Sequence, residues 1–214
     1  MNINNLEIHN ADCMEIMKDY PDDYFDLAVV DPPYGIGAAK NPISAGKWKR
    51  EIHKAKNWDN SPPQAAYFIE LKRISKHQII WGGNYYLNHL TNTPCFIVWD
   101  KKLTNGWLAD CELAWTSFET QTKMFTRHHI EDYNAGIKRI HPTQKPIALY
   151  KWIYTNYAEP GQKILDTHLG SGSNAIAAHY ADMGEFVGCE LDEEYYTAAC
   201  KRIENETAQL TLGF

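Results

Sequence analysis

The sequence lacks the features that mark several large classes of protein. No apolar run is long enough to span a bilayer, and the segment Met1 to Glu7 has neither a cationic start nor an apolar signal core. The five cysteines are odd in number and include no C-x-x-C pair, which argues against a disulfide framework and against a zinc site. We therefore expect a cytoplasmic protein with neither a membrane nor a metal as partner.

The sequence is also short of positive charge, with 21 lysines and arginines against 27 acidic residues. A net charge of −6 is unfavourable for binding nucleic acid, but the charges are unevenly placed. Residues 38–56 carry many cations against Glu51 alone, and phosphate contact needs only such a local patch. A solvated loop is an equally good interpretation on charge alone. The cations are Lys40, Lys47, Lys49, Arg50, Lys54 and Lys56.

The composition that is present is that of a globular protein, with 44% hydrophobic residues in a chain of 214. This length predicts a single domain over residues 1–214. Apolar runs bounded by turn residues predict strands at 25–30, 78–81, 95–99, 111–115, 163–166 and 185–190. Helical spacing predicts helices over 64–76, 147–158 and 173–183. Their alternation predicts a doubly wound α/β fold with a mostly parallel sheet.

Residues 163–190 form the clearest unit: a strand, a glycine turn, a helix and a second strand that ends in Glu190. Gly170 and Gly172 let the backbone approach a ligand, and an acidic residue after the second strand hydrogen-bonds ribose hydroxyls in such folds. There is no Gly-Lys-Ser/Thr sequence and no third glycine, which excludes a P-loop and argues against a dinucleotide. A nucleoside without a pyrophosphate is the better ligand, and a turn that merely starts a helix is the alternative. Asp166 either accepts from that ligand or only caps the turn.

Asp31-Pro32-Pro33-Tyr34 follows the predicted strand 25–30, at the end where open α/β sheets bind ligands. An exocyclic amine on a nucleobase is a poor nucleophile because its lone pair is delocalised into the ring. A carboxylate and a proline-fixed carbonyl that accept its two N–H bonds would favour the pyramidal nitrogen of the transition state. Asp31 and the Pro32 carbonyl suit these roles, and Tyr34 offers a face for a base taken out of the duplex. A strand-ending turn with a packed tyrosine is the alternative.

Four segments of the chain resemble those of the amino-methylating DNA methyltransferases, which act on adenine N6 or cytosine N4. The order of the segments along the chain is also that of one group of this family. Asp31 to Tyr34 is similar to the D-P-P-Y catalytic motif of that family, and residues 141–146, HPTQKP, are similar to its H-P-x-x-K-P segment. Residues 166–173, DTHLGSGS, resemble D-P-F-x-G-S-G-T, and residues 11–13 resemble a short acidic element before the catalytic strand. The group resembled is the one in which the catalytic motif precedes the cofactor motif. Thr167 and His168 depart from the pattern, which usually has proline and phenylalanine there.

The resemblance implies a seven-stranded Rossmann-like sheet and S-adenosylmethionine as cofactor. It places Asp12 and Cys13 by the cofactor adenine, Glu190 on the ribose, and Thr143 with Lys145 near the carboxylate of the methionine moiety. The implied cofactor-binding residues are Asp12, Cys13, Asp31, His141, Thr143, Lys145, Asp166, His168, Gly170, Ser171, Gly172 and Glu190. The implied catalytic residues are Asp31, Pro32, Pro33 and Tyr34. The chain then divides into a catalytic half, about 1–117, a short target-recognition insert, about 118–140, and a cofactor half, about 141–205.

Double-stranded DNA is the expected partner, and the resemblance to the family also suggests a homodimer. The cations of residues 38–56 are candidates for phosphate contact, and Trp48 and Trp58 beside them are candidates for stacking or core packing. The insert adds Lys123, Arg127, Lys138 and Arg139 as candidate DNA-binding residues. It is too short to read many base edges, so we expect a short recognition sequence or help from a second subunit.

The resemblance predicts methyl transfer to adenine N6 of a flipped base, within DNA methylation and restriction-modification. Aspartate at the first position of the catalytic motif favours adenine, whereas serine is more frequent there in the cytosine-N4 enzymes, which remain the alternative. An RNA or protein-amide N-methyltransferase is a further alternative, which the order of the motifs disfavours. The last alternative is a catalytically inactive DNA-binding protein, and the intact Asp31 and Tyr34 argue against it.

Overall fold

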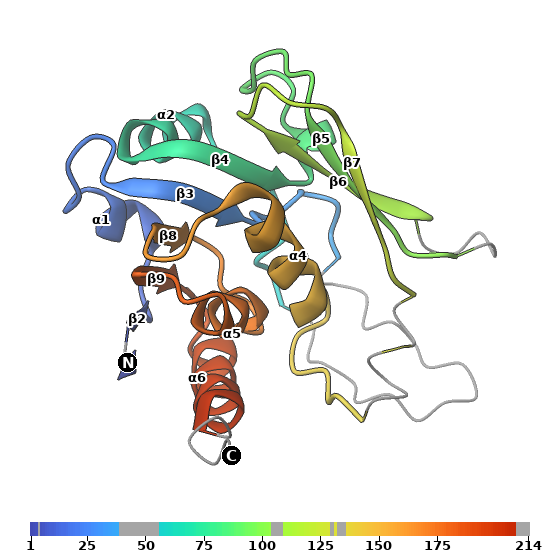
Figure 1. The fold of residues 1–214 in the computed structure, drawn as a ribbon. Coiled ribbons are helices and arrows are strands. Elements are labelled where there is room, and N and C mark those ends of the chain that lie inside the picture. The colour runs from blue at the N-terminus through green and yellow to red at the C-terminus, as the bar shows by residue number, and fades with distance from the viewer. Residues whose placement is uncertain (4, 39–55, 104–108, 129–130, 132–135, 209–214) are drawn as a thin grey trace.

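The computed structural model describes residues 1–3, 5–38, 56–103, 109–128, 131 and 136–208. Their strands form one sheet in the order β1-β2-β9-β8-β3-β4-β6-β5-β7. The central strands are parallel: β2 (Leu6–His9), β9 (Glu185–Cys189), β8 (Lys163–Asp166), β3 (Phe25–Val30) and β4 (Ser75–Trp81). This confirms the predicted α/β class with a mostly parallel sheet (Figure 1).

The expected number of strands is wrong, because the described residues form nine strands and not seven. At one edge, the two-residue β1 (Asn2–Ile3) pairs with β2 in the antiparallel sense. At the other edge, β6 (Cys111–Thr116) pairs antiparallel with β4 and β5 (Phe96–Asp100), and β7 (Lys123–Thr126) extends β5 in parallel. β7 lies inside the segment expected to be an insert, so part of that segment belongs to the sheet.

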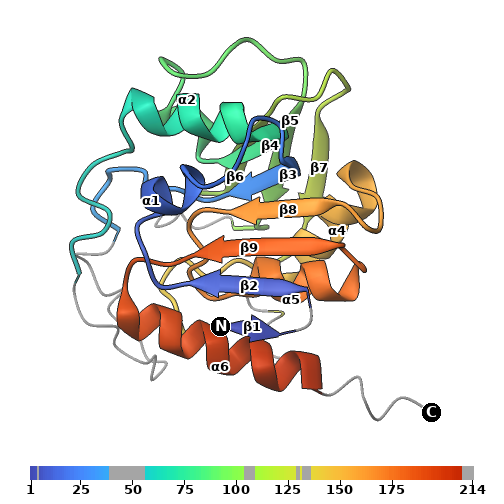
Figure 2. The ribbon, with the colours of Figure 1, turned by 90° about the vertical axis from the view of Figure 1, so that its left-hand side faces the viewer.

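Helices cover both faces of the sheet (Figure 2). Alternate residues of β3 point to opposite faces, so Leu27 and Val29 pack in one core cluster while Ala28 and Val30 pack in the other. The first cluster contains side chains of α4 (Ile147–Tyr157), α5 (Ser173–Tyr180) and α6 (Glu193–Ala208). The second contains side chains of α1 (Cys13–Met17) and α2 (Ala65–Ile74). Both faces of β3 are therefore buried, as expected for the middle of a parallel sheet.

The predicted helix over 64–76 ends earlier than expected. α2 stops at Ile74, and β4 begins at the next residue, so Ser75 and Lys76 belong to the strand. The Ser75 hydroxyl donates to the Leu71 carbonyl at 2.5 Å, which satisfies an acceptor that the end of the helix leaves open. No glycine or proline marks this boundary, and for that reason the sequence does not reveal it.

The central strands β3, β8 and β9 are parallel, so their carboxyl ends lie together at the same end of the sheet. The segments that follow them are the Asp31 turn, the glycine turn and the Glu190 turn. A short 3-10 helix, Gly83–Tyr85, follows β4 at the same end. The topology thus brings the predicted catalytic and cofactor segments together. Among the described helices, none has the length and apolar character needed to cross a membrane.

Candidate active site

The Asp31-Pro32-Pro33-Tyr34 turn follows β3 directly. Its two proline carbonyls already have a partner, because the buried Tyr86 hydroxyl lies 2.8 Å from the Pro32 oxygen and 2.7 Å from the Pro33 oxygen. Tyr86 is 1% exposed, and this contact holds the turn against the core. Sequence reasoning missed Tyr86, although its place after β4, beside β3, put it at this end of the sheet.

Both oxygens of the Asp31 carboxylate are engaged. The Tyr34 hydroxyl donates to Oδ1 at 2.7 Å, and the Lys145 ammonium donates to Oδ2. Burial and the charge of Asp31 raise the pKa of Tyr34 well above its ordinary value, so the hydroxyl keeps its proton and stays a donor. Lys145, expected by a cofactor carboxylate, here joins the cofactor segment to the catalytic turn.

The Tyr34 ring is packed on more than one side. The Tyr85 ring stacks on it with a centroid distance of 5.0 Å and an interplanar angle of 17°. Gly82 approaches the same ring so closely that an added Cβ would lie 2.3 Å from Tyr34 Cε1, and its φ of 70° is one that glycine adopts without strain. Tyr85 is 47% exposed, so one face of the Tyr34 ring is covered by a tyrosine that is itself open to solvent.

The segment after the catalytic turn is fixed by Asp59, a carboxylate that is 1% exposed. The backbone N–H of Gly35 donates to Asp59 Oδ1 at 2.8 Å, and that of Ala38 donates to Oδ2 at 2.7 Å. Gly37 N–H donates to the Asp59 carbonyl at 3.1 Å. Three backbone donors thus converge on one residue, which orders the chain immediately after Tyr34.

The glycine turn lies between β8 and α5. Gly172 has a φ of 74°, and an added Cβ would lie 3.0 Å from two side-chain carbons of Ile203, so glycine is required by both conformation and space. Arg202 of α6 donates to the Ser171 carbonyl at 2.8 Å and to the Ser173 hydroxyl at 2.9 Å. Helix α6, absent from the sequence prediction, therefore braces this turn.

Glu190 is held by backbone donors at the end of β9. Its Oε2 accepts from Gly170 N–H at 2.9 Å, and its Oε1 accepts from Asp192 N–H at 3.0 Å. Burial raises the pKa of Glu190 above its ordinary value, while the two N–H donors counteract part of that effect. Each carboxylate oxygen keeps further acceptor capacity toward a ligand in the cavity.

His168 and Cys13 are both neutral in this environment. Burial lowers the pKa of His168 to about 4 and raises the pKa of the Cys13 thiol to about 12. The His168 Nδ1 contacts the Thr167 hydroxyl at 2.9 Å, and Asp12 caps α1 by accepting from Met14 N–H at 2.8 Å. An uncharged ring, a thiol and a carboxylate with one remaining oxygen suit the packing and hydrogen bonding of a purine.

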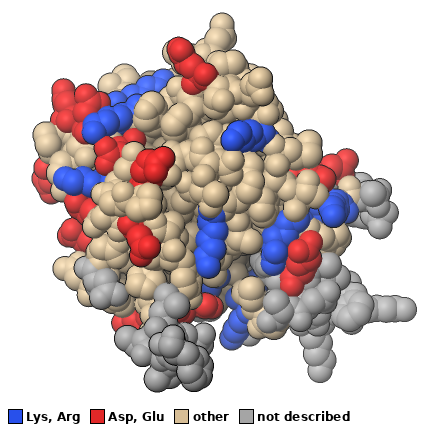
Figure 3. Space-filling view, viewed as in Figure 1, with Lys and Arg blue, Asp and Glu red and all other residues tan. Residues whose placement is uncertain are grey.

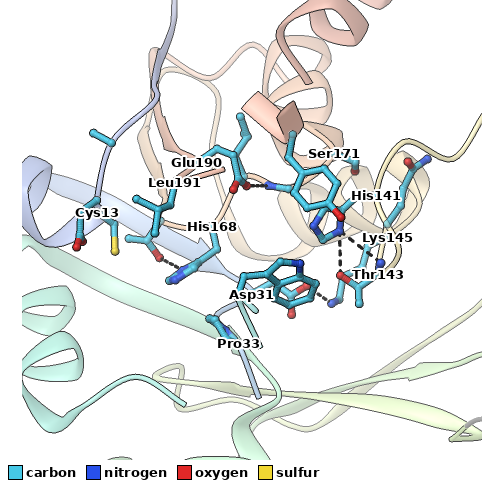
Figure 4. A pocket seen from close by; sticks show the side chains of 18 of the residues that line it. Cys13, Asp31, Pro33, His141, Thr143, Lys145, His168, Ser171, Glu190 and Leu191 are labelled. Atoms are coloured by element: carbon cyan, nitrogen blue, oxygen red, sulfur yellow. Dashed lines mark hydrogen bonds and ion pairs between the residues drawn. The ribbon is translucent and has the colours of Figure 1, made fainter. Parts of the chain in front are cut away.

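One cavity contains most of the predicted site (Figure 4). In this view, Cys13 lies at one end and Thr143 and Lys145 at the other, with His168 and Asp31 between them. The predicted residues that line it are Asp12, Cys13, Asp31, Pro33, His141, Thr143, Lys145, His168, Gly170, Ser171 and Glu190. Pro32, Tyr34, Asp166 and Gly172 are not among the residues that line it. Lining residues that the sequence did not single out as cofactor residues are Ala11, Trp58, Gln144, Tyr150, Thr167, Leu169, Leu191 and Tyr195.

Two aromatic rings flank His141 in this cavity. The Tyr195 ring lies edge-on at a centroid distance of 4.3 Å, and the Trp58 ring is tilted at 5.3 Å. His141 Nδ1 lies 3.1 Å from the Thr143 hydroxyl. Trp58, a candidate for stacking or core packing, thus lines the cavity and packs against His141.

Asp166 is 2% exposed and its carboxylate is turned toward protein groups. It accepts from His168 N–H at 3.0 Å and from the Asn174 side chain at 2.9 Å. Burial raises its pKa to about 7, although both donors act in the opposite direction. These contacts match the turn-capping alternative for this residue.

The candidate DNA-binding residues are only partly covered by the structure. Lys40, Lys47, Lys49, Arg50 and Lys54 lie outside the described residues. Lys56 pairs with Asp192 at 2.5 Å and Glu194 at 2.9 Å, and Lys123 donates to Asn156 at 2.8 Å. Arg127 pairs with Glu131 at 3.3 Å and Arg139 donates to the Gln144 carbonyl at 3.2 Å, while Lys138 is also engaged. On the face drawn in Figure 3, the described lysines and arginines lie among acidic residues.

The parallel sheet, the glycine turn, the Glu190 position and the Asp31 turn, all at one cavity, define a Rossmann-like methyltransferase of the kind that modifies amino groups. A family model described as DNA methylase matches residues 45–201, and the chain belongs to this family of N6/N4 amino-methylating DNA methyltransferases. The predicted family is thereby confirmed. Within the described residues, no group of three or more His, Cys, Asp or Glu is arranged to hold a metal ion.

Individual relatives are distant in sequence. The Escherichia coli (strain K12) protein YubD is 23% identical over 90% of this chain and 88% of its own length. The Type II methyltransferase M.BglII of Bacillus subtilis is 24% identical over 94% of this chain and 69% of its own. Among solved structures, the cytosine-N4-specific PvuII DNA methyltransferase has a TM-score of 0.60 at 12% identity, covering 98% of this chain and 94% of its own. The complex of M1.HpyAVI with S-adenosylmethionine has a TM-score of 0.59 at 19% identity, covering 92% and 99%.

Proposed function

We propose that the chain transfers a methyl group from S-adenosylmethionine to the exocyclic amine of a flipped base in double-stranded DNA, with adenine N6 as the target. One observation carries the proposal: Asp31 and Pro33 of the catalytic turn line the same cavity as Gly170 and Glu190 of the cofactor turn. Methyl transfer needs donor and acceptor in line within one site, and a cavity lined by both segments supports the proposal that they meet there.

The cavity residues fit S-adenosylmethionine. Glu190 presents a carboxylate fixed by two backbone donors, as a ribose diol requires, and Cys13 with neutral His168 offers an uncharged bed for adenine. The Ser171 and Gly170 backbone lies beside the expected place of the methionine moiety. M1.HpyAVI, whose fold is similar, has been solved with this cofactor bound.

When bound, S-adenosylmethionine supplies a methyl group activated by its sulfonium. The chain then has to localise the lone pair of the amine and stabilise the positive charge that develops on its nitrogen. Asp31 accepts an N–H of the amine, and Tyr34 supports the carboxylate through its hydroxyl. The second acceptor is a proline carbonyl of the turn, which Tyr86 holds in place. Trp58 and Tyr195 line the cavity and pack against His141.

Cytosine N4 is the second candidate, because a solved structure with a similar fold is specific for it. Both bases present an exocyclic amine next to a ring nitrogen, so the roles of Asp31 and of the proline carbonyls are the same for either. Aspartate in the motif supports adenine. A role in restriction-modification is also part of the proposal, since M.BglII is a Type II methyltransferase.

DNA contact is proposed for the basic residues of two segments that follow the Asp31 turn in the sequence. Residues 38–56 would contact phosphates, and the segment of about 118–140, between the catalytic and cofactor halves of the single domain, would contribute to target recognition. Lys56 is held by two acids, which disfavours phosphate contact by this residue. A homodimer would double the recognition surface of so short a segment.

The experiment is to incubate duplex DNA with the protein and isotopically labelled S-adenosylmethionine, and to identify labelled nucleosides by mass spectrometry. Label in N6-methyl-2′-deoxyadenosine that is lost in Asp31→Ala supports the proposal. Label in N4-methylcytosine keeps the mechanism and changes the base. Absence of label from every base, with the cofactor still bound, would remove DNA as the substrate and turn the search to RNA or protein acceptors.

A further inference from the structure

Behind the catalytic turn, charged side chains of alternating sign form a chain that ends at Asp31. Lys145 contacts Asp31 on one side and Glu112 on the other, the latter at 3.1 Å. Glu112 in turn pairs with Lys101 at 2.5 Å. The side chain of Lys145 is 3% exposed, so its charge is balanced by these two carboxylates and not by water.

Both members of the Lys145–Glu112 pair are ionised at neutral pH. Burial alone would lower the pKa of Lys145, but the charges of Asp31 and Glu112 outweigh it and raise that pKa. Burial alone would raise the pKa of Glu112, but the charges of Lys145 and Lys101 outweigh it and hold that pKa below its ordinary value. The ammonium of Lys145 is therefore a full positive charge shared between two anions.

This arrangement poses a problem for the proposed reaction. Asp31 has to accept an N–H of the target amine and to stabilise positive charge on that nitrogen, yet its Oδ2 already accepts from an ammonium. A cation bound only to Asp31 would neutralise it and compete with the amine. A second anion on the far side of Lys145 weakens that competition, because it attracts the same charge away from Asp31.

We propose that Glu112 is a positioning residue for Asp31 that acts through Lys145: it shares the charge of the ammonium, so that Lys145 neutralises the Asp31 carboxylate less and Asp31 stays available to the target amine. The inference rests on the proposed methyl transfer at Asp31. Glu112 comes from β6, on the far side of β4 from the catalytic strand, and lies in none of the family-like motifs.

The local charge balance gives the role a sign. Asp31 and Glu112 carry two negative charges, and Lys145 and Lys101 carry two positive charges, so the four side chains balance overall. Replacing Glu112 by glutamine leaves two cations against the Asp31 carboxylate, which disfavours a target nitrogen that becomes positive. Replacing Lys101 by methionine instead leaves two carboxylates against Lys145, which favours that nitrogen, although both variants lose the same ion pair of 2.5 Å.

The test compares Glu112→Gln, Glu112→Asp and Lys101→Met in single-turnover methylation of duplex DNA at saturating labelled S-adenosylmethionine. Glu112→Gln is expected to slow methyl transfer about tenfold or more, with the cofactor Kd and the DNA Kd changed by less than about threefold. Glu112→Asp, which keeps the charge, restores most of the rate. Lys101→Met leaves the rate unchanged or increases it.

Two outcomes overturn the inference while leaving the proposed function in place. One is a Glu112→Gln variant as fast as wild type, and the other is an equal loss of rate in Glu112→Gln and Lys101→Met, which would indicate a structural ion pair. A melting temperature for each variant shows whether a slow protein is a folded one. A wild-type protein that methylates no DNA overturns the proposed function, and this inference with it.

Discussion

The two sides of the cavity are built differently. On the cofactor side, polar side chains are held by groups close in sequence: Glu190 by N–H donors 20 and 2 positions away, and Asp166 by groups 2 and 8 positions away. On the catalytic side, Asp31 is held by Lys145 from 114 positions away, and Pro32 by Tyr86 from 54. The cofactor side is largely a local fold of one βαβ unit, whereas the catalytic side is an assembly of distant strands.

This difference indicates that the cofactor side depends mainly on local structure, whereas the catalytic side depends on contacts between distant segments. A turn whose ligand groups are oriented by its own backbone can form as soon as β8, α5 and β9 pack. The orientation of Asp31 instead requires β3, β4, β6 and the segment before α4 to be in register. Substitutions on the cofactor side should therefore change binding, and substitutions on the catalytic side should change the rate of the chemical step.

The largest expected effect comes from Asp31. Asp31→Ala removes both the acceptor and the charge, and we expect single-turnover methylation to fall about thousandfold, while Asp31→Asn keeps an acceptor and loses about a hundredfold. The cofactor Kd, measured by calorimetry, should stay within about fivefold of wild type because Glu190 and the glycine turn are unchanged. A larger effect on cofactor binding than on rate would contradict the division of the cavity.

Glu190 should give the opposite pattern. Glu190→Ala removes the acceptor for the ribose and leaves the N–H groups of Gly170 and Asp192 without their partner, so the cofactor Kd should rise about 10- to 100-fold. At saturating cofactor, the rate of methyl transfer should fall by less than about tenfold. Glu193→Ala, an exposed acid in the first turn of α6, is the matched control and should leave both unchanged.

Asp59 tests whether the catalytic side depends on contacts away from the cavity. Asp59→Ala removes the acceptor for Gly35 and Ala38, and it should lower the free energy of unfolding by about 3 kcal/mol, as measured by urea denaturation. Methyl transfer should slow about tenfold, because the chain after Tyr34 is no longer fixed. Asp22→Ala removes an exposed carboxylate that pairs with Arg73, and should cost less than about 1 kcal/mol. Equal destabilisation by both would remove the special role of Asp59.

The same contrast explains what the sequence could and could not predict. The Asp31 turn and the glycine turn could be predicted, because each is a short run of consecutive residues whose types have a clear structural or chemical purpose. Glu112, Asp59 and Tyr86 were not visible, because each is a common residue type whose partner lies on another element. Nothing in a run such as Glu112-Leu113-Ala114 signals an ion pair with a residue of another segment.

The fold shows a similar limit. Strands with long apolar runs were predicted to within a few residues, whereas β2, β7 and α6 were missed. Helix α6 is mostly polar, yet Tyr195, Ala199 and Ile203 are buried at a spacing of four residues, a signal that could have revealed it. The two-residue β1 has no sequence signal of its own, because its pairing with β2 depends on the turn between them.

The smallest expected effect concerns two buried groups of the cofactor turn with opposite pH dependence. The pKa of Asp166 is raised to about 7 in the folded protein, so the folded state binds more protons than the unfolded state between about pH 4 and 7, and Asp166 lowers stability as the pH rises through that range. The pKa of His168 is lowered to about 4, so the folded state binds fewer protons up to about pH 6.5, and His168 raises stability as the pH rises.

Because the two windows overlap, their contributions largely cancel between about pH 4 and 6.5, and single variants should reveal them. In Asp166→Asn only the contribution of His168 remains. Urea denaturation should then show a free energy of unfolding that rises with pH more steeply than in wild type, by up to about 1.4 kcal/mol per pH unit. His168→Asn should show the reverse. If neither slope differs from wild type, burial does not shift the pKa values of Asp166 and His168 in this way, and the neutral His168 ring proposed to lie beside the cofactor adenine would lose its support.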